Sequence, residues 1–450
     1  MDAFNENLNE QQAQQPMGCL HRFSKTIKVV IIGLLILLLM IPMFMIENLI
    51  SERGRTQEEA IDEVSEKWSL AQTITGPYLN LQYPVVTENN GEKKVSIKDL
   101  ILFPDELMVN GQLKTEILKR SIYEVNVYQS ELTLKGSFSS EELKKSRIDM
   151  DQLQFDRAAI CLNLTDMRGI SEQISIPLGD SVYIFEPGMD NRGIANTGVH
   201  AIANLSELKQ NKKLPYEIKI KLKGSQSLNF IPLGKTTRVD LKANWNTPSF
   251  TGNYLPNNRN ITEKEFSAQW QVLNLNRNYS QVMADYNTSN IKDIENSSFG
   301  VNFKIPVEQY QQSMRSAKYA ILIILLTFGV IFFTEIMNNT RIHALQYLLV
   351  GLALCLFYSL LLSFSEHVGF NPAYLLSSAL TIILVGGYMF GITKKKKPSL
   401  IMSGLLGILY LYIFVLIQLE TFALLAGSLG LFIILAMVMY FSKKIDWFNE

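Results

Sequence analysis

The sequence predicts an α-helical polytopic membrane protein with six transmembrane helices and a large inserted β-rich, sandwich-like extracytoplasmic domain. Long apolar runs lie near the start of the chain and in its last third, whereas the middle has mixed polarity. Segments of the middle alternate apolar and polar residues with period two, which is typical of strands with one wet face. Four lysines, Lys394–Lys397, separate two membrane-length apolar runs and fix that loop on the cytoplasmic side.

Composition excludes some classes of protein. The chain has 42 Lys and Arg residues against 42 Asp and Glu residues, so no bulk attraction to nucleic acid is expected. The cysteines are Cys19, Cys161 and Cys355, and only Cys161 is predicted outside the membrane and cytoplasm. The extracytoplasmic domain is therefore expected to hold together without an intrachain disulfide, and no cysteine pair has zinc-binding spacing.

The first membrane-length run follows a polar start. Residues 1–28 are rich in Asn, Gln and Glu, end in a basic collar and are predicted to be a disordered cytoplasmic tail. Residues 29–50 are predicted to be transmembrane helix 1, an uncleaved signal anchor. The alternative is a cleaved signal peptide, but the run is long for one and no A-x-A-like site follows it.

Residues 51–316 contain no membrane-length apolar run and are predicted to form a periplasmic β-rich domain. Thr56 is expected to cap an amphipathic stalk helix that ends at Gly76-Pro77. Period-two alternation predicts strands, and short helices are expected at Glu141–Arg147 and Val199–Lys209. The predicted strands are Ser121–Lys135, Tyr216–Lys223, Arg238–Trp245, Phe266–Leu275 and Phe299–Ile305.

Two stretches of this domain resemble each other. Tyr123-Glu124-Val125 leads to Leu134-Lys135-Gly136-Ser137, and Tyr216-Glu217-Ile218 leads to Leu222-Lys223-Gly224-Ser225. An Ile-Pro-Leu-Gly sequence follows each, at Ile176 and at Ile231. A duplicated β-sandwich lobe is one interpretation. The alternative is that similar hairpins use similar residues.

The last third is predicted to be a five-helix membrane domain, residues 317–441, followed by a cytoplasmic tail, residues 442–450. All predicted inner segments carry Lys or Arg, and the outer loops 365–372 and 418–421 carry none, so both termini are predicted to be cytoplasmic. The five predicted helices span 317–337, 345–364, 373–392, 400–419 and 422–441.

Four polar residues of the membrane domain are candidate functional residues. Glu335 and His343 lie near the predicted inner end of their helices, and Glu366 and His367 lie together at the outer end. Intramembrane ionisable groups raise a functional hypothesis by default. The alternatives are a proton, ion or metal role for the Glu366–His367 pair, or a hydrogen-bonded interfacial role. Glu420 occupies another predicted outer turn.

The extracytoplasmic domain offers no catalytic constellation. His200 is its single histidine, no G-x-S-x-G elbow accompanies it, and a hydrogen-bonded structural role is expected. No P-loop or dinucleotide fingerprint is present. No catalytic residue, cofactor or metal ligand is therefore predicted. The aromatic stretch Trp245–Pro256 is either a ligand platform or a buried corner, and its Pro and Gly punctuation favours the corner.

Several motifs resemble those of the CreD family of inner-membrane proteins. Trp245–Pro256 reads Trp-x-x-Pro-Ser-Phe-x-Gly-x-Tyr-Leu-Pro, and the resemblance runs from about Arg53 to Trp447. The other motifs are Phe266-Ser-Ala-Gln-Trp270, Asp166-Met-Arg168-Gly169-Ile170, Lys318–Leu322 through Phe332-Phe333-Thr334-Glu335, His343-x-x-Gln346-Tyr347, Ser365-Glu366-His367-x-Gly369-Phe370 and Ile445-Asp446-Trp447. The resemblance implies a polytopic inner-membrane protein linked to envelope maintenance and stress, with no defined biochemical activity and no assigned catalytic residue.

These observations predict a non-enzymatic protein that supports cell-envelope integrity. Its expected partners are the lipid bilayer and periplasmic or cell-wall proteins, and no nucleic acid is expected. One alternative is a transporter or conduit, since five clustered helices exceed what anchoring requires, although the inverted repeats of transporters are not evident. The other is a membrane-interface enzyme that uses Glu366 and His367.

Overall fold

The computed structural model describes residues 24–443 except 90–91, 147, 190–192, 211, 285–287, 304–307, 339–340 and 420–421. The chain divides into two compact units. The helical unit combines the residues up to Thr56 with those from Val307 onward, and the sheet unit comprises Gln57–Pro306. Most of the two predicted cytoplasmic tails, Glu420 and the Ile445-Asp446-Trp447 motif lie outside the described residues.

The helix α1 (Ser24–Trp68) is continuous and contributes to both units. It includes residues 24–28, which were expected in the disordered tail, and passes through the predicted stalk without interruption. The expectation that Thr56 starts a new helix is wrong, because Thr56 Oγ1 donates to the Glu52 carbonyl 3.0 Å away, one turn earlier. The helix ends at Trp68, and Gly76-Pro77 lies within the first strand.

Five helices of the described residues are long and apolar enough to cross a membrane. They are the apolar part of α1 and the helices α5, α6, α7 and α8. The apolar part described for α9, Leu425–Met437, is shorter, so the predicted count of six is not reached there. The helices that join α1 in this unit are α4 (Glu308–Lys318), α5 (Ala320–Asn338), α6 (Ala344–Val368), α7 (Phe370–Thr393), α8 (Lys396–Gln418) and α9 (Ala423–Ser442).

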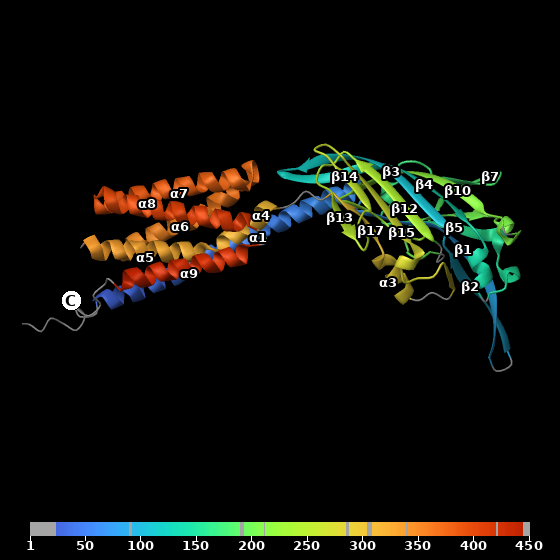
Figure 1. Cartoon of the computed structure of the whole chain (residues 1–450), viewed down its shortest axis with the longest axis horizontal. Helices are drawn as coiled ribbons and strands as arrows, with labels where there is room; N and C mark the ends of the chain where they lie inside the picture. Colours follow the sequence, from blue (N-terminus) through green and yellow to red (C-terminus); the bar gives the residue numbers. More distant parts are fainter. Residues whose placement is uncertain are drawn as a thin grey trace, which may run out of the picture. The chain divides into compact units, whose positions relative to one another are not determined.

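The connections of the helical unit are shorter than predicted. The expected outer loop 365–372 is helical on both sides of Gly369, whose φ of 79° lets α6 turn directly into α7. The predicted lysine loop shrinks to Lys394 and Lys395 because α8 begins at Lys396. The helix predicted at 317–337 begins later than expected, because α4 continues to Lys318 and α5 starts at Ala320. Figure 1 shows α6, α7 and α8 lying side by side as successive antiparallel neighbours.

The sheet unit contains two large sheets (Figure 1). The six-stranded sheet has the order β10-β4-β3-β12-β15-β14 and is antiparallel except for the parallel pair β3–β12. Its strands are β3 (Glu106–Arg120), β4 (Tyr123–Phe138), β10 (Leu214–Ser225), β12 (Thr236–Ala243), β14 (Asn258–Ile261) and β15 (Phe266–Leu273).

The nine-stranded sheet has the order β13-β17-β11-β1-β5-β9-β8, with β2 and β16 attached beside β1. Its strands are β1 (Gln72–Asn89), β2 (Glu92–Leu102), β5 (Ala158–Leu164), β8 (Glu186–Pro187), β9 (Val199–Ala203), β11 (Ser227–Phe230), β13 (Ser249–Gly252), β16 (Val282–Ala284) and β17 (Phe299–Asn302). A separate pair joins β6 (Ser175–Leu178) to β7 (Ser181–Ile184), and the short α-helices are α2 (Glu141–Lys145) and α3 (Thr288–Asn296).

One apolar core lies between the two large sheets. It combines residues of the six-stranded sheet such as Val109 and Ile218 with residues of the nine-stranded sheet such as Leu79 and Ile160. A second cluster, which includes Phe103 and Ile294, covers part of the other face of the nine-stranded sheet. The seven residues of β5 are all buried and all but Asn163 are apolar, so this strand shows no alternation of apolar and polar residues.

The period-two strands were located correctly, and the expectation of a helix at Val199–Lys209 was wrong. Val199–Lys209 forms β9 and a 3-10 turn, Ser206–Gln210, because β9 pairs with β5. The two similar stretches lie on β4 and β10, which pair with each other in one sheet and place Ile218 opposite Leu134. This pairing, within a single compact unit, favours the alternative that similar hairpins use similar residues.

Candidate functional site

Glu335, near the end of α5, binds groups from three segments of the helical unit. Its carboxylate forms an ion pair with the Lys28 ammonium of α1. It also accepts hydrogen bonds of 3.2 Å from the Tyr347 hydroxyl of α6 and from the Ile342 N–H. Its side chain is 12% exposed, so this carboxylate replaces its lost hydration with charged and polar partners.

Lys28 has a second partner at the same place. Its ammonium donates to the Ile342 carbonyl at 3.0 Å and lies 6.0 Å from the centre of the Tyr347 ring. The Glu335 cluster, defined here as Lys28, Glu335, Ile342 and Tyr347, thus joins the start of α1, the end of α5 and the start of α6.

His343 has a structural position beside this cluster. Its Nδ1 accepts a hydrogen bond from the Leu345 N–H at 3.2 Å, and the Gln346 side chain accepts one from the His343 N–H at 3.0 Å. These reciprocal bonds form a capping box and satisfy N–H groups at the start of α6. His343-x-x-Gln346 is thus the start signal of this helix.

Glu366 lies near the opposite end of α6 and has two partners of its own. The Arg53 guanidinium of α1 lies 3.5 Å from its carboxylate, and the Tyr310 hydroxyl of α4 donates to it at 3.0 Å. The Glu366 side chain is 9% exposed, whereas His367 is exposed. Neither partner of Glu366 is His367, so the structure does not bring the predicted Glu–His pair together.

The two carboxylate clusters are separated by most of the length of α6. From Tyr347 to Glu366 the helix rises about 28 Å, close to the thickness of a bilayer's hydrocarbon core. Between them, Gly351 of α6 leaves room for Leu39 of α1 and Phe328 of α5, and a Cβ at Gly351 would collide with Leu39. An ion pair therefore fixes each end of the apolar part of α1, at Lys28 and at Arg53, to the neighbouring helices, with close apolar packing between.

Asp166 fixes the other end of α1 within the sheet unit. Its carboxylate accepts hydrogen bonds from the Leu70 N–H at 2.9 Å and from the Arg168 side chain at 2.9 Å. Arg168 also donates to the Glu66 carbonyl, in the last turn of α1, at 2.6 Å. The Gln72 side chain completes the joint by donating to the Asp166 carbonyl at 2.7 Å.

The pKa of Asp166 reflects these contacts. Burial acts to raise the pKa of this carboxyl, but hydrogen bonds and the charge of Arg168, together with the Leu70 N–H, outweigh burial. The pKa therefore lies below its ordinary value, and the joint holds an ionised carboxylate at neutral pH. Gly169 is required beside it, because a Cβ there would meet Gln72 Nε2 and Ser69 Oγ at 2.8 Å.

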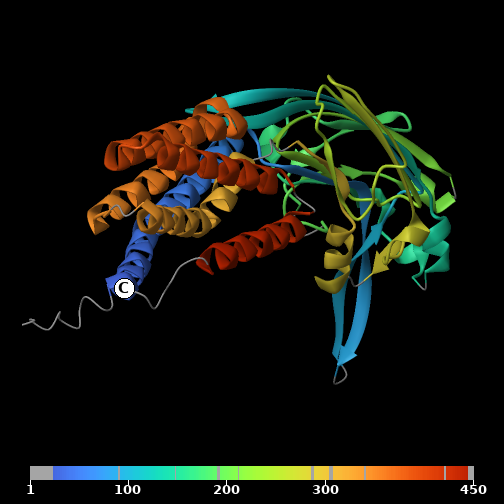
Figure 2. The same cartoon turned by 60° about the vertical axis from the view of Figure 1, so that its left-hand side comes forward.

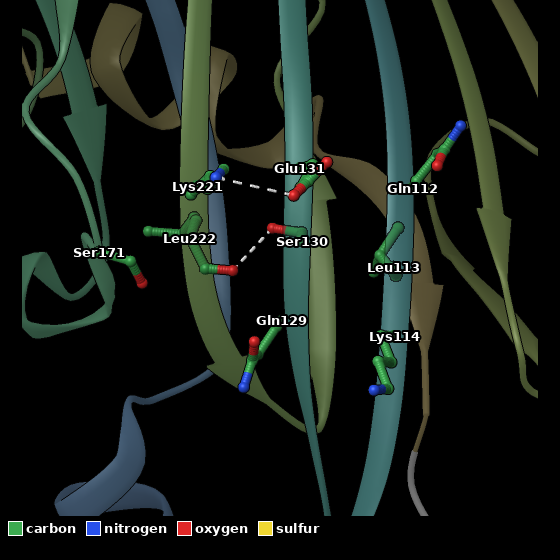
Figure 3. A pocket seen from close by; sticks show the side chains of 9 residues that line it. All are labelled: Gln112, Leu113, Lys114, Gln129, Ser130, Glu131, Ser171, Lys221 and Leu222. Atoms are coloured by element: carbon green, nitrogen blue, oxygen red, sulfur yellow. Dashed lines mark hydrogen bonds and ion pairs between the residues drawn. The ribbon is translucent and has the colours of Figure 1, made fainter.

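The outer face of the six-stranded sheet carries a polar groove (Figure 3). A hollow of about 300 Å³ over β3, β4 and β10 adjoins one of about 710 Å³, and both are lined by Glu131 and Lys221. Lys221 binds Glu172 at 2.8 Å. Charges of both signs on cross-strand neighbours are the ordinary composition of a wet sheet face, so the groove by itself specifies no ligand.

Other predicted residues have structural contacts. His200 Nδ1 lies 2.7 Å from the Gly188 carbonyl, as expected of a hydrogen-bonded structural histidine. Phe250 packs against Phe266 and Trp270, with ring centres 5.9 and 5.7 Å away, but Trp245–Pro256 is a half-buried corner at most, because Leu255 is 68% exposed. Among the described residues, no group of three or more His, Cys, Asp or Glu is arranged to hold a metal ion.

Sequence reasoning missed the cations that complete these sites. Lys28 was assigned only to a basic collar, Arg53 received no role, and Asp166 and Arg168 entered only through a family motif. One signal was present, because Lys28 and Arg53 bracket the first apolar run at about its two ends. Pairing them with particular carboxylates required the packing of α1 on α5 and α6.

Comparison with known proteins gives consistent results. A family model described as "Inner membrane protein CreD" matches residues 24–448. The chain is 32% identical over 420 residues to a protein of Escherichia coli (strain K12) named "Inner membrane protein CreD". That alignment covers 92% of this chain and 91% of the relative.

Proposed function

The chain belongs to the CreD family of inner membrane proteins, and on that premise we propose that it supports envelope integrity and the stress response without catalysing a reaction. In this proposal, residues 57–306 are displayed in the periplasm to protein or cell-wall partners. The observation that carries it is the continuity of α1, which is secured by Lys28 and Arg53 in one unit and by the Asp166 joint in the other.

The distribution of positive charge supports this orientation. Lys28, Arg341 and the lysines at the start of α8 lie at the same end of the helical unit, because α6 and α7 form a direct antiparallel hairpin. Short basic segments remain cytoplasmic in membrane proteins. We therefore place both termini in the cytoplasm. We also propose α9 as the sixth span, because its 20 residues would rise about 30 Å.

Two groups of contacts favour a supporting role for the membrane helices over transport or interfacial catalysis. Glu366 is engaged by Arg53 and Tyr310 and does not meet His367. Aromatic rings fill the space between α6, α7 and α8, where the Phe357 ring centre lies 4.5 Å from that of Tyr410 and 5.4 Å from that of Tyr374. These contacts join helices firmly, as a platform for the sheet unit requires.

The continuity of α1 is tested by substituting Gly54, which lies inside the helix and where an added Cβ would meet no neighbouring atom within 4 Å. Gly54→Ala raises the helix propensity at this position, whereas Gly54→Pro removes a helix hydrogen bond and kinks the helix. Each variant is introduced into a strain that lacks this gene and is sensitive to detergent. We expect Gly54→Ala to restore resistance and Gly54→Pro to fail at equal membrane abundance. Full rescue by Gly54→Pro would refute the proposed role of α1.

A further inference from the structure

The first two strands of the sheet unit continue beyond the rest of their sheet. β1 and β2 pair from Leu79–Leu102 to Asn89–Glu92. β5 accompanies β1 only as far as Asn80, and β16 accompanies β2 only over Leu100–Leu102. Residues 82–89 and 92–99 therefore form a two-stranded arm, called here the β1–β2 ribbon, which extends past the other strands in Figure 2.

One face of this ribbon is apolar and exposed. Val86 pairs with Val95, and Pro84 pairs with Ile97, so their side chains share a face. Val86, Val95 and Ile97 are 59%, 62% and 63% exposed. The opposite face is different, since Tyr83 is buried in the core and Val85 packs against it. The exposed face amounts to roughly a few hundred Å², within the range of the largest apolar patch on a typical monomer, and such patches are often functional.

The edges of the ribbon discourage the addition of another strand, whereas its apolar face is open to a partner. Pro84 has no N–H to offer a neighbouring strand on the β1 side. Lys93, Lys94 and Lys98 line β2, and lysines on an edge strand discourage the addition of another strand. A partner is therefore expected on the apolar face and not along an edge.

The charged and polar residues around the apolar face are arranged so that the same face of a second copy would place opposite charges against each other. Toward the tip, Glu88 lies opposite Lys93 on the paired strand. Toward the base, Gln82 donates to the Asp99 carboxylate at 3.3 Å. Two copies can face each other across a two-fold axis that runs parallel to the strands and between the two ribbons. This rotation stacks β1 of one copy on β2 of the other. It places each Glu88 over a Lys93, each Asp99 over a Gln82, and valine over valine between them.

We propose that the apolar face of the β1–β2 ribbon docks on the same face of a second copy of this chain. A self-complementary patch of this kind is what a two-fold interface requires. The area is below the roughly 800 Å² per partner of stable dimers, so the contact is weak for free molecules. It gains from the high effective concentration of two chains held in one membrane.

Cross-linking of the full chain in isolated membranes tests the contact. Val95→Cys is treated with a short bis-maleimide, and Val182→Cys on β7, which is 66% exposed, serves as the matched control. The unsubstituted chain reports any reaction of the native thiols. We expect several-fold more cross-linked dimer from Val95→Cys than from Val182→Cys. Equal yields, or cross-linking of Val95→Cys to a different protein, would overturn the proposal.

A charge test shows whether the contact is between ribbons. In the Val95→Cys background, Glu88→Lys and Lys93→Glu each place like charges opposite each other in a homodimer. When the two variants are co-expressed with different tags, opposite charges face each other again. We expect each variant alone to lose most of its cross-linked dimer and the mixture to recover a mixed dimer. Recovery of no mixed dimer would contradict the stacked arrangement.

Discussion

Lys28 and Glu335 form an ion pair between residues 307 positions apart in the chain. Because Glu335 also binds Tyr347 and Ile342, one carboxylate joins the start of α1 to the end of α5 and the start of α6. Arg53 and Glu366 form the corresponding pair near the opposite end of α6. The first helix is therefore an integral part of the helical unit and not only a signal anchor.

Removing one partner of the Lys28–Glu335 pair should destabilise the protein. Lys28→Ala leaves the carboxylate of Glu335 largely buried with hydrogen bonds but no counter-charge. We expect a loss of about 2–3 kcal/mol, less than the roughly 3–5 kcal/mol for breaking a fully buried pair, because Lys28 is partly exposed. Thermal unfolding in detergent micelles measures it, with Leu37→Ala as a control on an exposed side of α1. A Lys28→Ala variant as stable as that control would contradict this prediction.

His343 should act as a helix cap and not as a proton or metal site. His343→Ala removes the acceptor for the Leu345 N–H and should cost about 1 kcal/mol, whereas His343→Asn supplies another acceptor and should preserve most of the stability. Unfolding of the two variants is compared with that of the parent chain. Loss of function in His343→Asn at unchanged stability would point to a chemical role instead.

Stability of the sheet unit should decrease in acid through Asp166. Because its folded-state pKa lies below the ordinary value, the carboxylate stabilises the fold above the unfolded pKa of about 3.9. That stabilisation is lost as the pH falls through the folded pKa. When the pH falls from about 5 to about 3, Asp166→Asn should therefore lose less stability than the parent chain. Tryptophan fluorescence measures unfolding, and Asp180→Asn is an exposed control. Equal acid sensitivity of Asp166→Asn and the parent chain would contradict the assignment.

Gly169 should tolerate no side chain at the Asp166 joint. A Cβ would meet Gln72 and Ser69 and also the Lys223 carbonyl, so Gly169→Ala should lower stability by about 1–3 kcal/mol. Gly54→Ala provides the contrast, because it has open space and a helical backbone and should stabilise by up to about 1 kcal/mol. Denaturant unfolding of both variants checks the sign of each change. A stabilising Gly169→Ala would show that the joint can relax.

Much of the fold could be predicted from the sequence because its signals are local. Apolar runs located the membrane helices, and period-two alternation located β4, β10, β12 and β15. β5 was missed because a strand that is buried on both faces does not alternate. Val199–Ala203 was assigned to a helix because its apolar spacing is ambiguous over five residues, and pairing with β5 decides its structure.

The candidate sites were harder to predict because they depend on distant partners. Glu335 and Glu366 could be selected as costly membrane carboxylates, but their roles are set by Lys28 and Arg53, which only helix packing brings near them. Glu366 and His367 are adjacent in sequence, yet successive residues of a helix point in directions about 100° apart. Adjacency therefore suggested a pair that the helix separates.

The most direct test of the account exchanges the charges of Arg53 and Glu366. In the detergent-sensitive strain that lacks this gene, Arg53→Glu and Glu366→Arg are introduced singly and together, with His367→Gln as the neighbouring control and membrane levels matched. If Glu366 fastens α1, each single change impairs rescue, and the double variant and His367→Gln restore it. If the double variant reaches normal abundance and still fails, Glu366 performs chemistry or transport, and the supporting role proposed for the membrane helices is wrong.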